Sequence, residues 1–399
     1  MINSEVNSQG FLESARRKAK DFTRKRNLSF PLLCLFLLKT VRECLFIAFS
    51  KFAENIGETT ISMTEQSISE ARNKIRWEAF AELSWKVGLL AYSDDYETWN
   101  GYRLWAIDGT KIALPNIPSL REQFGDEKGS PMARGSILYD VLNYTILDAH
   151  IEPLAVDERT LAKRHVDALK KGMNGDKDLI ISDRGYPSED MIDYYESNNI
   201  KYLMRVRRKF NADVDAVAGN EGFVKIGKYA VRVIKVELNT GEIEVLLTNL
   251  MENVDYKGLY FCRWGVEKEY DVLKNALEIE NFSGRSETAI KQDFYAHIIA
   301  SNLLVASYWE AQEIVNAERN ENTENKREYK VNVSQSAGIL KSYIIRAILV
   351  KTTREREQLL AEMHERMARA VVPIRPNRIV PRKKNNRVSK FKHNRKSNL

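Results

Sequence analysis

The stretch that decides the fold is Arg103–Thr110, which reads RLWAIDGT: four apolar residues followed by an aspartate and a glycine. A second stretch, Leu179–Tyr186 (LIISDRGY), repeats this order with three apolar residues, a serine, an aspartate and a glycine. Short apolar runs that stop at a glycine predict buried β-strands. Asp108 and Asp183 are therefore expected at strand ends, where α/β sheets place their ligands.

The segments around these two strands alternate between strand-like and helical patterns. Three further strands are predicted at Ser136–Leu142, Tyr144–Leu154 and Lys201–Val206, and two helices at Glu158–Lys170 and Ser188–Ser197. The resulting order, β-β-β-α-β-α-β, predicts the α/β class, with a mixed sheet flanked by helices.

Residues 208–250 break this rhythm and predict a small β insertion. Its three antiparallel strands are expected at Val224–Ile226, Tyr229–Val236 and Ile243–Leu247, with Asn239-Thr240-Gly241 as a turn. Helical patterns then return at Tyr260–Ile279, Glu287–Val315 and Val333–Arg369.

The first hundred residues are predicted to be helical. The apolar run Phe30–Leu38 is too short for a bilayer span, which needs about 20 residues, and is expected to form a buried helix. Residues 16–26 hold seven basic side chains and one acid, and the helix expected at Thr64–Lys74 carries an Arg/Lys/Asn face. These features suit a small DNA-binding bundle, but a plain helical domain with a solvated basic face remains the alternative.

The charge of the chain is concentrated at its end. The 399 residues carry a net charge of +7, whereas residues 375–399 alone hold ten basic residues and no acid, so the remainder carries −3. Concentrated basicity favours a polyanionic partner. Three cysteines without a CxxC pair argue against a disulfide scaffold or a zinc module, and no signal peptide opens the chain. We therefore expect a cytoplasmic protein.

Two aspartates from different strands could share a divalent cation. Oxygen ligands suit Mg²⁺ or Mn²⁺, and two such ions about 3.5–4 Å apart suit phosphodiester chemistry. The alternative is that Asp108, Asp183 or both cap a turn.

A polar stripe is predicted on the helix at Tyr260–Ile279. At 100° per residue, Tyr260, Arg263, Glu267 and Lys274 fall within an arc of about 60° and extend over roughly 21 Å. Such a stripe places a carboxylate between two cations, which suits metal binding beside DNA phosphates. The alternative is a solvated amphipathic face.

These residues resemble the signature of a family. The chain is similar to bacterial insertion-sequence transposases of the DDE class, in the subgroup marked by Tyr-x2-Arg-x3-Glu-x6-Lys. The similarity runs from roughly residue 20 to 350, and Asn281–Arg285 and Gln292–Tyr295 also match. The signature is complete here as Tyr260, Arg263, Glu267 and Lys274, and Asp108 and Asp183 match the two catalytic aspartates.

The resemblance implies a ribonuclease-H-like fold with the β insertion before the catalytic glutamate. It implies that Asp108, Asp183 and Glu267 hold two Mg²⁺ (or Mn²⁺) ions in each active site. The activity it implies is metal-dependent cleavage and strand transfer at the ends of an insertion sequence, which is cut-and-paste transposition.

The resemblance also implies DNA-binding residues and partners. Arg263 and Lys274 would grip phosphates near the transposon end, and Tyr260 would make a polar contact there. Arg184 is a weaker candidate for a phosphate contact, with a structural ion pair as the alternative. The implied partners are double-stranded DNA, as terminal inverted repeats and target DNA, and a second copy of the chain in a synaptic complex. The implied location is the bacterial cytoplasm, at the nucleoid.

The predicted domains follow from these patterns. They are a helical DNA-binding domain (1–98), a catalytic domain (99–207 and 251–315), a β insertion (208–250), a C-terminal helical region (316–372) and a flexible basic tail (373–399).

Two other functions remain open: a DNA-binding regulator that has lost catalysis, and a stand-alone metal-dependent endonuclease. Three intact carboxylates argue against the first, and the signature helix favours strand transfer over the second. His150, His165 and His297 are isolated in the sequence and are expected to be structural or at the surface. Trp264 borders the stripe; core packing is favoured over stacking on an unpaired base.

Overall fold

The computed structural model describes residues 1–24, 27–40, 43–58, 61–93, 95–173, 177–238, 240–320 and 327–375. All but the first three residues of the predicted basic tail, and Asn239 of the predicted turn, lie outside these ranges. Among the described residues, none of the helices has both the length and the apolar character that a membrane span requires.

The chain divides into two compact units. A sheet unit contains Gly88–Lys111 and Arg134–Tyr270, and a helical unit contains Met1–Val87, Ile112–Ala133 and Asp271–Leu399. These boundaries differ from those of the predicted domains, because the N-terminal helices and the last helices of the chain belong to one unit.

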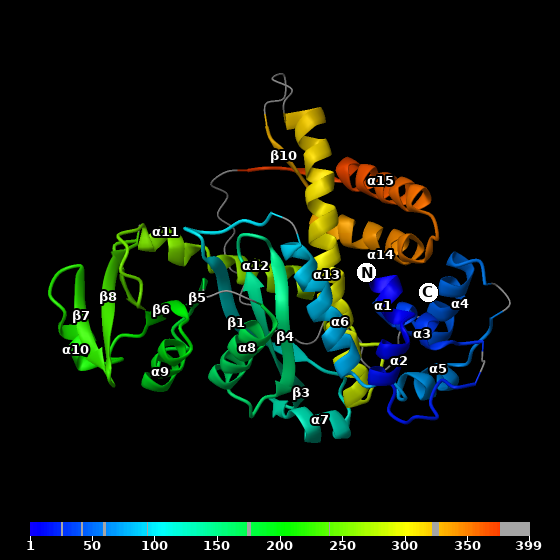
Figure 1. Cartoon of the computed structure of the whole chain (residues 1–399), viewed down its shortest axis with the longest axis horizontal. Helices are drawn as coiled ribbons and strands as arrows, with labels where there is room; N and C mark the ends of the chain where they lie inside the picture. The colour runs from blue at the N-terminus through cyan, green and yellow to red at the C-terminus, as the bar shows by residue number, and fades with distance from the viewer. Residues whose placement is uncertain are drawn as a thin grey trace. The chain divides into compact units, whose positions relative to one another are not determined.

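The sheet unit is built on a mixed sheet, which confirms the predicted fold class (Figure 1). Its strands lie in the order β2-β3-β1-β5-β6-β9-β8-β7, with β4 paired to β3. The strands are β1 (Arg103–Ala113), β2 (Asp126–Glu127), β3 (Ser130–Asp140), β4 (Thr145–Pro153), β5 (Asp178–Ser182), β6 (Lys201–Val206), β7 (Glu221–Ile226), β8 (Tyr229–Glu237) and β9 (Ile243–Thr248).

Helices cover this sheet. Helices α8 and α9 pack along β4 and β6, and α11 packs along β8 (Figure 1). The helices of this region are α8 (Glu158–Gly172), α9 (Glu189–Ser197), α10 (Ala212–Ala216), α11 (Tyr256–Phe261) and α12 (Trp264–Asp271), after a short 3₁₀ turn at Leu90–Tyr92.

The β insertion extends the main sheet. Strands β7, β8 and β9 are antiparallel, as predicted, and β9 continues the sheet by pairing with β6, Leu203 opposite Thr248. The insertion is therefore anchored by backbone hydrogen bonds to the strand that follows α9.

The parallel core pairs β5 with β1 on one side and with β6 on the other. Trp105 and its neighbours in β1 are fully buried, as expected of a strand covered on both faces. Several strand boundaries differ from the prediction: β3 begins at Ser130 and not at Ser136, and β1 does not end after Asp108 but continues to Ala113. Beyond Asp108 it remains part of the sheet beside β3, a tertiary pairing that Gly109 and Thr110 did not reveal.

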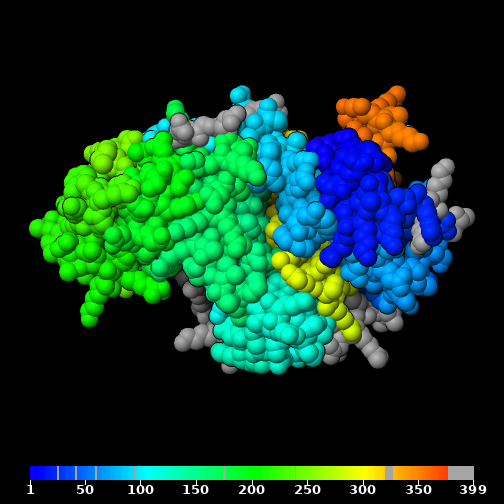
Figure 2. All heavy atoms as spheres, turned by 60° about the horizontal axis from the view of Figure 1, so that its bottom comes forward, coloured from blue at the N-terminus to red at the C-terminus, as the bar shows by residue number. Residues whose placement is uncertain are grey.

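In the helical unit, α3, α14 and α15 pack against the long helix α13 (Figure 1). The N-terminal helices form a continuous surface (Figure 2). The helical elements of this part are α1 (Ile2–Val6), α2 (Gln9–Ala15), α3 (Phe30–Leu38), α4 (Leu45–Asn55), α5 (Glu65–Arg72), α6 (Glu78–Leu89), α7 (Pro118–Phe124), a π-helical turn (Val272–Ala276), α13 (Glu287–Val315), a second π-helical turn (Asn316–Asn320), α14 (Val333–Leu349) and α15 (Thr353–Arg369). A two-stranded ribbon joins β10 (Tyr329–Val331) to β11 (Val371–Pro373).

Several helix predictions hold, but the one at Val333–Arg369 does not. The apolar run Phe30–Leu38 forms a buried helix whose N-cap, Ser29, accepts a hydrogen bond from the Leu32 N–H. The helix expected at Val333–Arg369 is instead two helices, α14 and α15. The second helix begins after the N-cap Thr352, whose Oγ1 accepts a hydrogen bond from the Glu355 N–H and donates one to the Glu355 carboxylate.

The predicted basic face of Thr64–Lys74 is also partly wrong. Arg72 is 2% exposed and points into the helical unit. Its guanidinium pairs with Asp293 at 2.8 Å and donates to Gln292 Oε1 and Ser283 Oγ. These partners come from the two segments, Asn281–Arg285 and Gln292–Tyr295, that carried part of the family resemblance. Their role here is to hold a buried cation, not to read DNA.

Candidate active site

The register of β1 and β5 sets the first two carboxylates side by side. The parallel ladder runs from Arg103 opposite Asp178 to Ile107 opposite Ser182. Asp108 and Asp183 each follow the last of these paired residues, so the two aspartates lie side by side at the end of the ladder. Each turns its carboxylate onto the backbone beyond it: Asp108 Oδ1 accepts from the Gly109 N–H at 2.8 Å, and Asp183 Oδ1 from the Arg184 N–H at 2.7 Å.

The third carboxylate, Glu267, comes from α12. A Cβ atom at Gly265 would lie 3.3 Å from Tyr139 and 3.5 Å from Val141, so this glycine lets the helix approach β3 closely. The helix predicted at Tyr260–Ile279 is not continuous. A turn at Cys262 and Arg263 separates α11 from α12, and the last part is a π-helical turn. The regular spacing of 100° per residue therefore applies only within α12.

Arg263 connects the carboxylates. Its guanidinium donates to Glu267 Oε1 at 2.7 Å and lies 3.7 Å from Asp108 Oδ2. The side chain is 4% exposed, and it lies over the ring of Tyr260, 5.7 Å from the centroid. Tyr260 is buried too, and its hydroxyl donates to Asp183 Oδ1 in a long contact of 3.4 Å. The structure thus brings together Asp108, Asp183, Tyr260, Arg263 and Glu267.

Two further residues, Arg184 and Lys274, were predicted to bind DNA. Arg184 follows Asp183, and its side chain is exposed. Lys274 lies in the π-helical turn Val272–Ala276, is half-buried, and belongs to the helical unit, whereas the carboxylates belong to the sheet unit. Single π turns inside helices often occur at functional sites. DNA contact by Arg184 and Lys274 stays a prediction.

Charge is concentrated at Asp108. Burial raises the pKa of this carboxyl, and the negative charges of Glu267 and Asp183 add to the effect; against the opposing effects of the Gly109 N–H and of Arg263, the pKa comes to about 6. For Arg263, burial alone would lower the pKa, but Tyr260 and the three carboxylates together raise it. The guanidinium is therefore a permanent positive charge inside an acidic cluster.

The sequence analysis missed a fourth acidic side chain beside this cluster. Glu158, in the first turn of α8, lies so close to Gly109 that a Cβ there would be 3.2 Å from Glu158 Oε1, and a Cβ at Gly185 would be 3.5 Å from Oε2. Arg134 Nη1 pairs with this carboxylate at 2.5 Å. The signal was available, because a glycine follows Asp108 and Asp183 within two residues and indicates that another group approaches the backbone.

Two hydroxyl groups near the Asp108 carbonyl were also missed. The Tyr270 hydroxyl donates to this oxygen at 2.8 Å, and Ser136 Oγ lies 3.4 Å from it. Trp264 was predicted in the core, but its side chain is 43% exposed, so that prediction was wrong. It lies on α12, one residue after Arg263, on the side of the helix that the sheet leaves open.

Comparisons with known proteins identify the family. The sequence profile of the family described as transposase DDE domain matches residues 99–303, just over half of the chain. The chain belongs to the transposase DDE domain family. It is therefore a DNA transposase, an enzyme of a family that cuts and rejoins phosphodiester bonds with divalent metal ions.

A solved structure shares the fold of this transposase. The cryo-EM structure of the piggyBac transposase synaptic complex with hairpin DNA matches with a TM-score of 0.50 and 9% sequence identity, over 91% of this chain and 84% of that chain. The likeness confirms the ribonuclease-H-like fold. A search of curated proteins finds no match to the transposase.

Proposed function

We propose that this transposase acts on the ends of an insertion sequence by cut-and-paste transposition, with Asp108, Asp183 and Glu267 as its catalytic carboxylates. The observation that carries the proposal is the β1–β5 register, which places two aspartates level at the end of a parallel ladder. Glu267 is linked to Asp108 through Arg263. The complete Tyr-x2-Arg-x3-Glu-x6-Lys signature supports assignment to that bacterial subgroup.

The three carboxylates fit a pair of hard divalent cations. Every donor is a carboxylate oxygen, the ligand that Mg²⁺ and Mn²⁺ prefer. Burial is the main cause of the raised pKa of Asp108, and the negative charges of Glu267 and Asp183 add to it, so a bound cation would favour the ionised carboxylate. Two Mg²⁺ ions would supply activation of the attacking oxygen and stabilisation of the leaving oxygen. Because Arg263 spans Glu267 and Asp108, its guanidinium has to yield part of these contacts for the carboxylates to turn to cations.

Arg263 has a second role in this proposal. Before DNA arrives, it holds Glu267 and Asp108 together and offsets their repulsion. With bound cations compensating that charge, the guanidinium would be free to bind a DNA phosphate, for which its planar fork is well suited. Tyr260 lies under Arg263 and contacts Asp183, so it supports the arginine and the carboxylate in both states. We assign further phosphate contacts to Arg184 and Lys274.

The proposed partners are terminal inverted repeats, target DNA and a second copy of the chain in the synaptic complex. The ten basic residues of 375–399 add a sequence-independent attraction to DNA. We assign end recognition to the N-terminal part of the chain, where the exposed Arg17, Lys18 and Lys20 lie in the connection between α2 and α3.

The proposal is tested by replacing each carboxylate with alanine. Asp108→Ala, Asp183→Ala and Glu267→Ala should each abolish Mg²⁺-dependent nicking of a terminal-repeat substrate, since each removes a metal ligand. Binding to the same DNA in Ca²⁺, measured by gel shift, should persist. The matched control is Asp271→Ala, an exposed acid at the end of α12 that should leave nicking unchanged. Normal nicking by any of the three variants would remove that residue from the site.

Arg263 is tested separately. If it first holds carboxylates and then phosphate, Arg263→Ala should raise the Mg²⁺ concentration needed for nicking and also weaken assembly of end complexes in Ca²⁺. Arg263→Lys should restore the charge but only part of the assembly, because an ammonium cannot bind two oxygens in one plane. Assembly and Mg²⁺ dependence like those of the unmodified protein would contradict both roles.

A further inference from the structure

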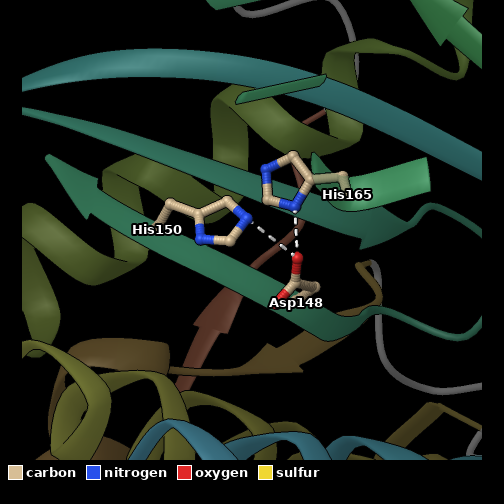
Figure 3. A group of neighbouring side chains, drawn as sticks. All are labelled: Asp148, His150 and His165. Atoms are coloured by element: carbon tan, nitrogen blue, oxygen red, sulfur yellow. Dashed lines mark hydrogen bonds and ion pairs between the residues drawn. The ribbon is translucent and has the colours of Figure 1, made fainter. Parts of the chain in front are cut away.

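A second cluster of possible metal ligands, made of residues other than the three carboxylates, lies in the sheet unit (Figure 3). Asp148 and His150 stand two residues apart on β4, so both side chains project from the same face of the strand. His165 comes from α8, which packs on β4. Within the described residues, these three form the one group of acidic, histidine or cysteine side chains whose ligand atoms all lie within 4.8 Å of one another.

The two imidazoles face the same carboxylate oxygen (Figure 3). His165 Nδ1 is 2.7 Å from Asp148 Oδ2, which is a hydrogen bond. His150 Nε2 is 3.2 Å from the same oxygen, within ion-pair distance, but it lacks the alignment of a hydrogen bond and has no other partner, although the atom is buried. Buried polar atoms are normally satisfied, and an exception often marks the position of a bound water or ion.

The second ring nitrogen of His165, Nε2, has the kind of partner that is common in known metal sites. Its Nε2 lies 2.9 Å from Ser136 Oγ. A histidine that binds metal through one ring nitrogen typically gives the N–H of the other to an oxygen, which fixes the orientation of the ring. His165 is fully buried, whereas the side chains of Asp148 and His150 are 16% and 19% exposed. Three ligands therefore lie on the protein side, and solvent can supply a fourth.

We propose that Asp148, His150 and His165 form a binding site for one divalent transition-metal ion, with Zn²⁺ as the first candidate. Two imidazoles and one carboxylate are a ligand set of zinc and iron centres, whereas Mg²⁺ and Ca²⁺ take oxygen ligands. The site is thus chemically distinct from the all-carboxylate cluster at Asp108. It needs only small movements, because donors around a tetrahedral Zn²⁺ lie about 2.0–2.2 Å from the ion.

Metal binding there would change a hydrogen bond at the active site. Without metal, Asp148 can only accept, so His165 carries its proton on Nδ1, and Nε2 accepts the Ser136 hydroxyl proton. With metal on Nδ1, Nε2 carries the proton and donates it to Ser136 Oγ. The Ser136 hydroxyl is then free to donate to the Asp108 carbonyl oxygen, 3.4 Å away. This consequence rests on the proposed role of Asp108, whereas the metal site itself does not.

The metal site is tested with Co²⁺ and Zn²⁺ on full-length protein in which the three catalytic carboxylates are replaced by alanine. Titration with Co²⁺ in excess Mg²⁺ should give visible absorption that saturates at one ion per chain, and Zn²⁺ should displace it. His150→Gln should lower the affinity for Co²⁺ at least about 100-fold, and Ser136→Ala about 10–100-fold. His364→Gln, a histidine outside the cluster, is the matched control and should bind as before.

The outcomes are distinct. Failure of Co²⁺ to saturate at one ion per chain, or equal affinity in the His150→Gln protein, would overturn the proposal and leave the cluster as a buried hydrogen-bonded group. His150→Gln is the informative variant, because His150 is partly exposed and makes no aligned hydrogen bond, so its loss should not prevent folding. The three carboxylates are replaced in the protein used for the titration, so the Co²⁺ result does not depend on whether those carboxylates are catalytic.

Discussion

Replacing Asp108 with asparagine should stabilise the metal-free protein at neutral pH. The folded chain holds this carboxyl at a pKa of about 6, above the 3.8 of an ordinary aspartate, chiefly because it is buried. Ionising it at pH 7 therefore costs folding free energy, up to about 3 kcal/mol. Asparagine carries no charge, and its carbonyl can still accept the Gly109 N–H that now binds Asp108 Oδ1.

The direction of the pKa shift determines how the free energy of unfolding changes with pH. A carboxyl whose pKa is raised by folding binds its proton more tightly in the folded state. Between pH 4 and 6 the folded state thus holds more protons than the unfolded state, and the stability of the unmodified protein falls as the pH rises. The free energy of unfolding that Asp108→Asn gains over the unmodified protein should be near zero at pH 4. It should grow by up to about 1.4 kcal/mol per pH unit and level off above pH 6.

The measurement is urea unfolding in EDTA, followed by circular dichroism, at half-unit steps from pH 4.5 to 8. Asp215→Asn is the matched control, since this carboxylate on α10 is exposed and should give no such profile. Adding Mg²⁺ should reduce the difference in free energy of unfolding between the unmodified protein and Asp108→Asn, because only the unmodified protein has all three carboxylates to bind the ion. A cation at 100 times its Kd contributes about 2.7 kcal/mol. An advantage that does not vary with pH would refute the reasoning.

Three further predictions concern packing and the tail. Arg72→Met should destabilise the protein by about 3–5 kcal/mol in urea unfolding, because it leaves Asp293 buried without its partner. Gly88→Ala should lower the midpoint of thermal unfolding, since its Cβ would lie 2.9 Å from the Ile146 carbonyl oxygen, and overpacking costs about 1–3 kcal/mol. Deleting residues 375–399 should weaken gel-shift binding to random DNA and flatten its salt dependence while sparing the preference for the proper ends; lost preference would show that the tail reads sequence.

The sequence predicted the elements of the sheet well because its strands carry a strong local signal. Runs such as Leu179–Ile181 are apolar at every position, as in a strand that is covered on both faces, and they are too short to form a helix. The β1 boundary could not be predicted, because its last residues belong to the sheet only through a partner strand far along the chain. The break at Cys262 and Arg263 was hidden for a similar reason: the 3.6-residue periodicity of the apolar positions continues through it.

The cluster of Asp148, His150 and His165 was harder to predict than the three carboxylates of the candidate active site. Asp148 and His150 share a strand face, a spacing visible in the sequence, but His165 joins them only through the packing of α8 on β4. The sequence analysis judged these histidines by their spacing along the chain, found none typical of a metal site, and so treated them as isolated. Arg72 shows the opposite error: a basic residue at the end of a short helix suggested a DNA-reading face, yet its partners lie more than two hundred residues away.

A buried ion pair at one end of the parallel ladder bears on the chemistry at the other. Arg103 and Asp178 face each other across β1 and β5, joined by two hydrogen bonds of 2.7 and 2.8 Å, and the Trp105 indole N–H also donates to Asp178. Such pairs add little net stability, since desolvation offsets their attraction, but a slipped register would leave both charges buried and unpaired. Since side chains alternate along a strand, a slip of one residue would also turn Asp108 away from Asp183. We infer that the pair specifies the register on which the catalytic carboxylates depend, which explains why two charged residues occupy the most buried strands of the sheet.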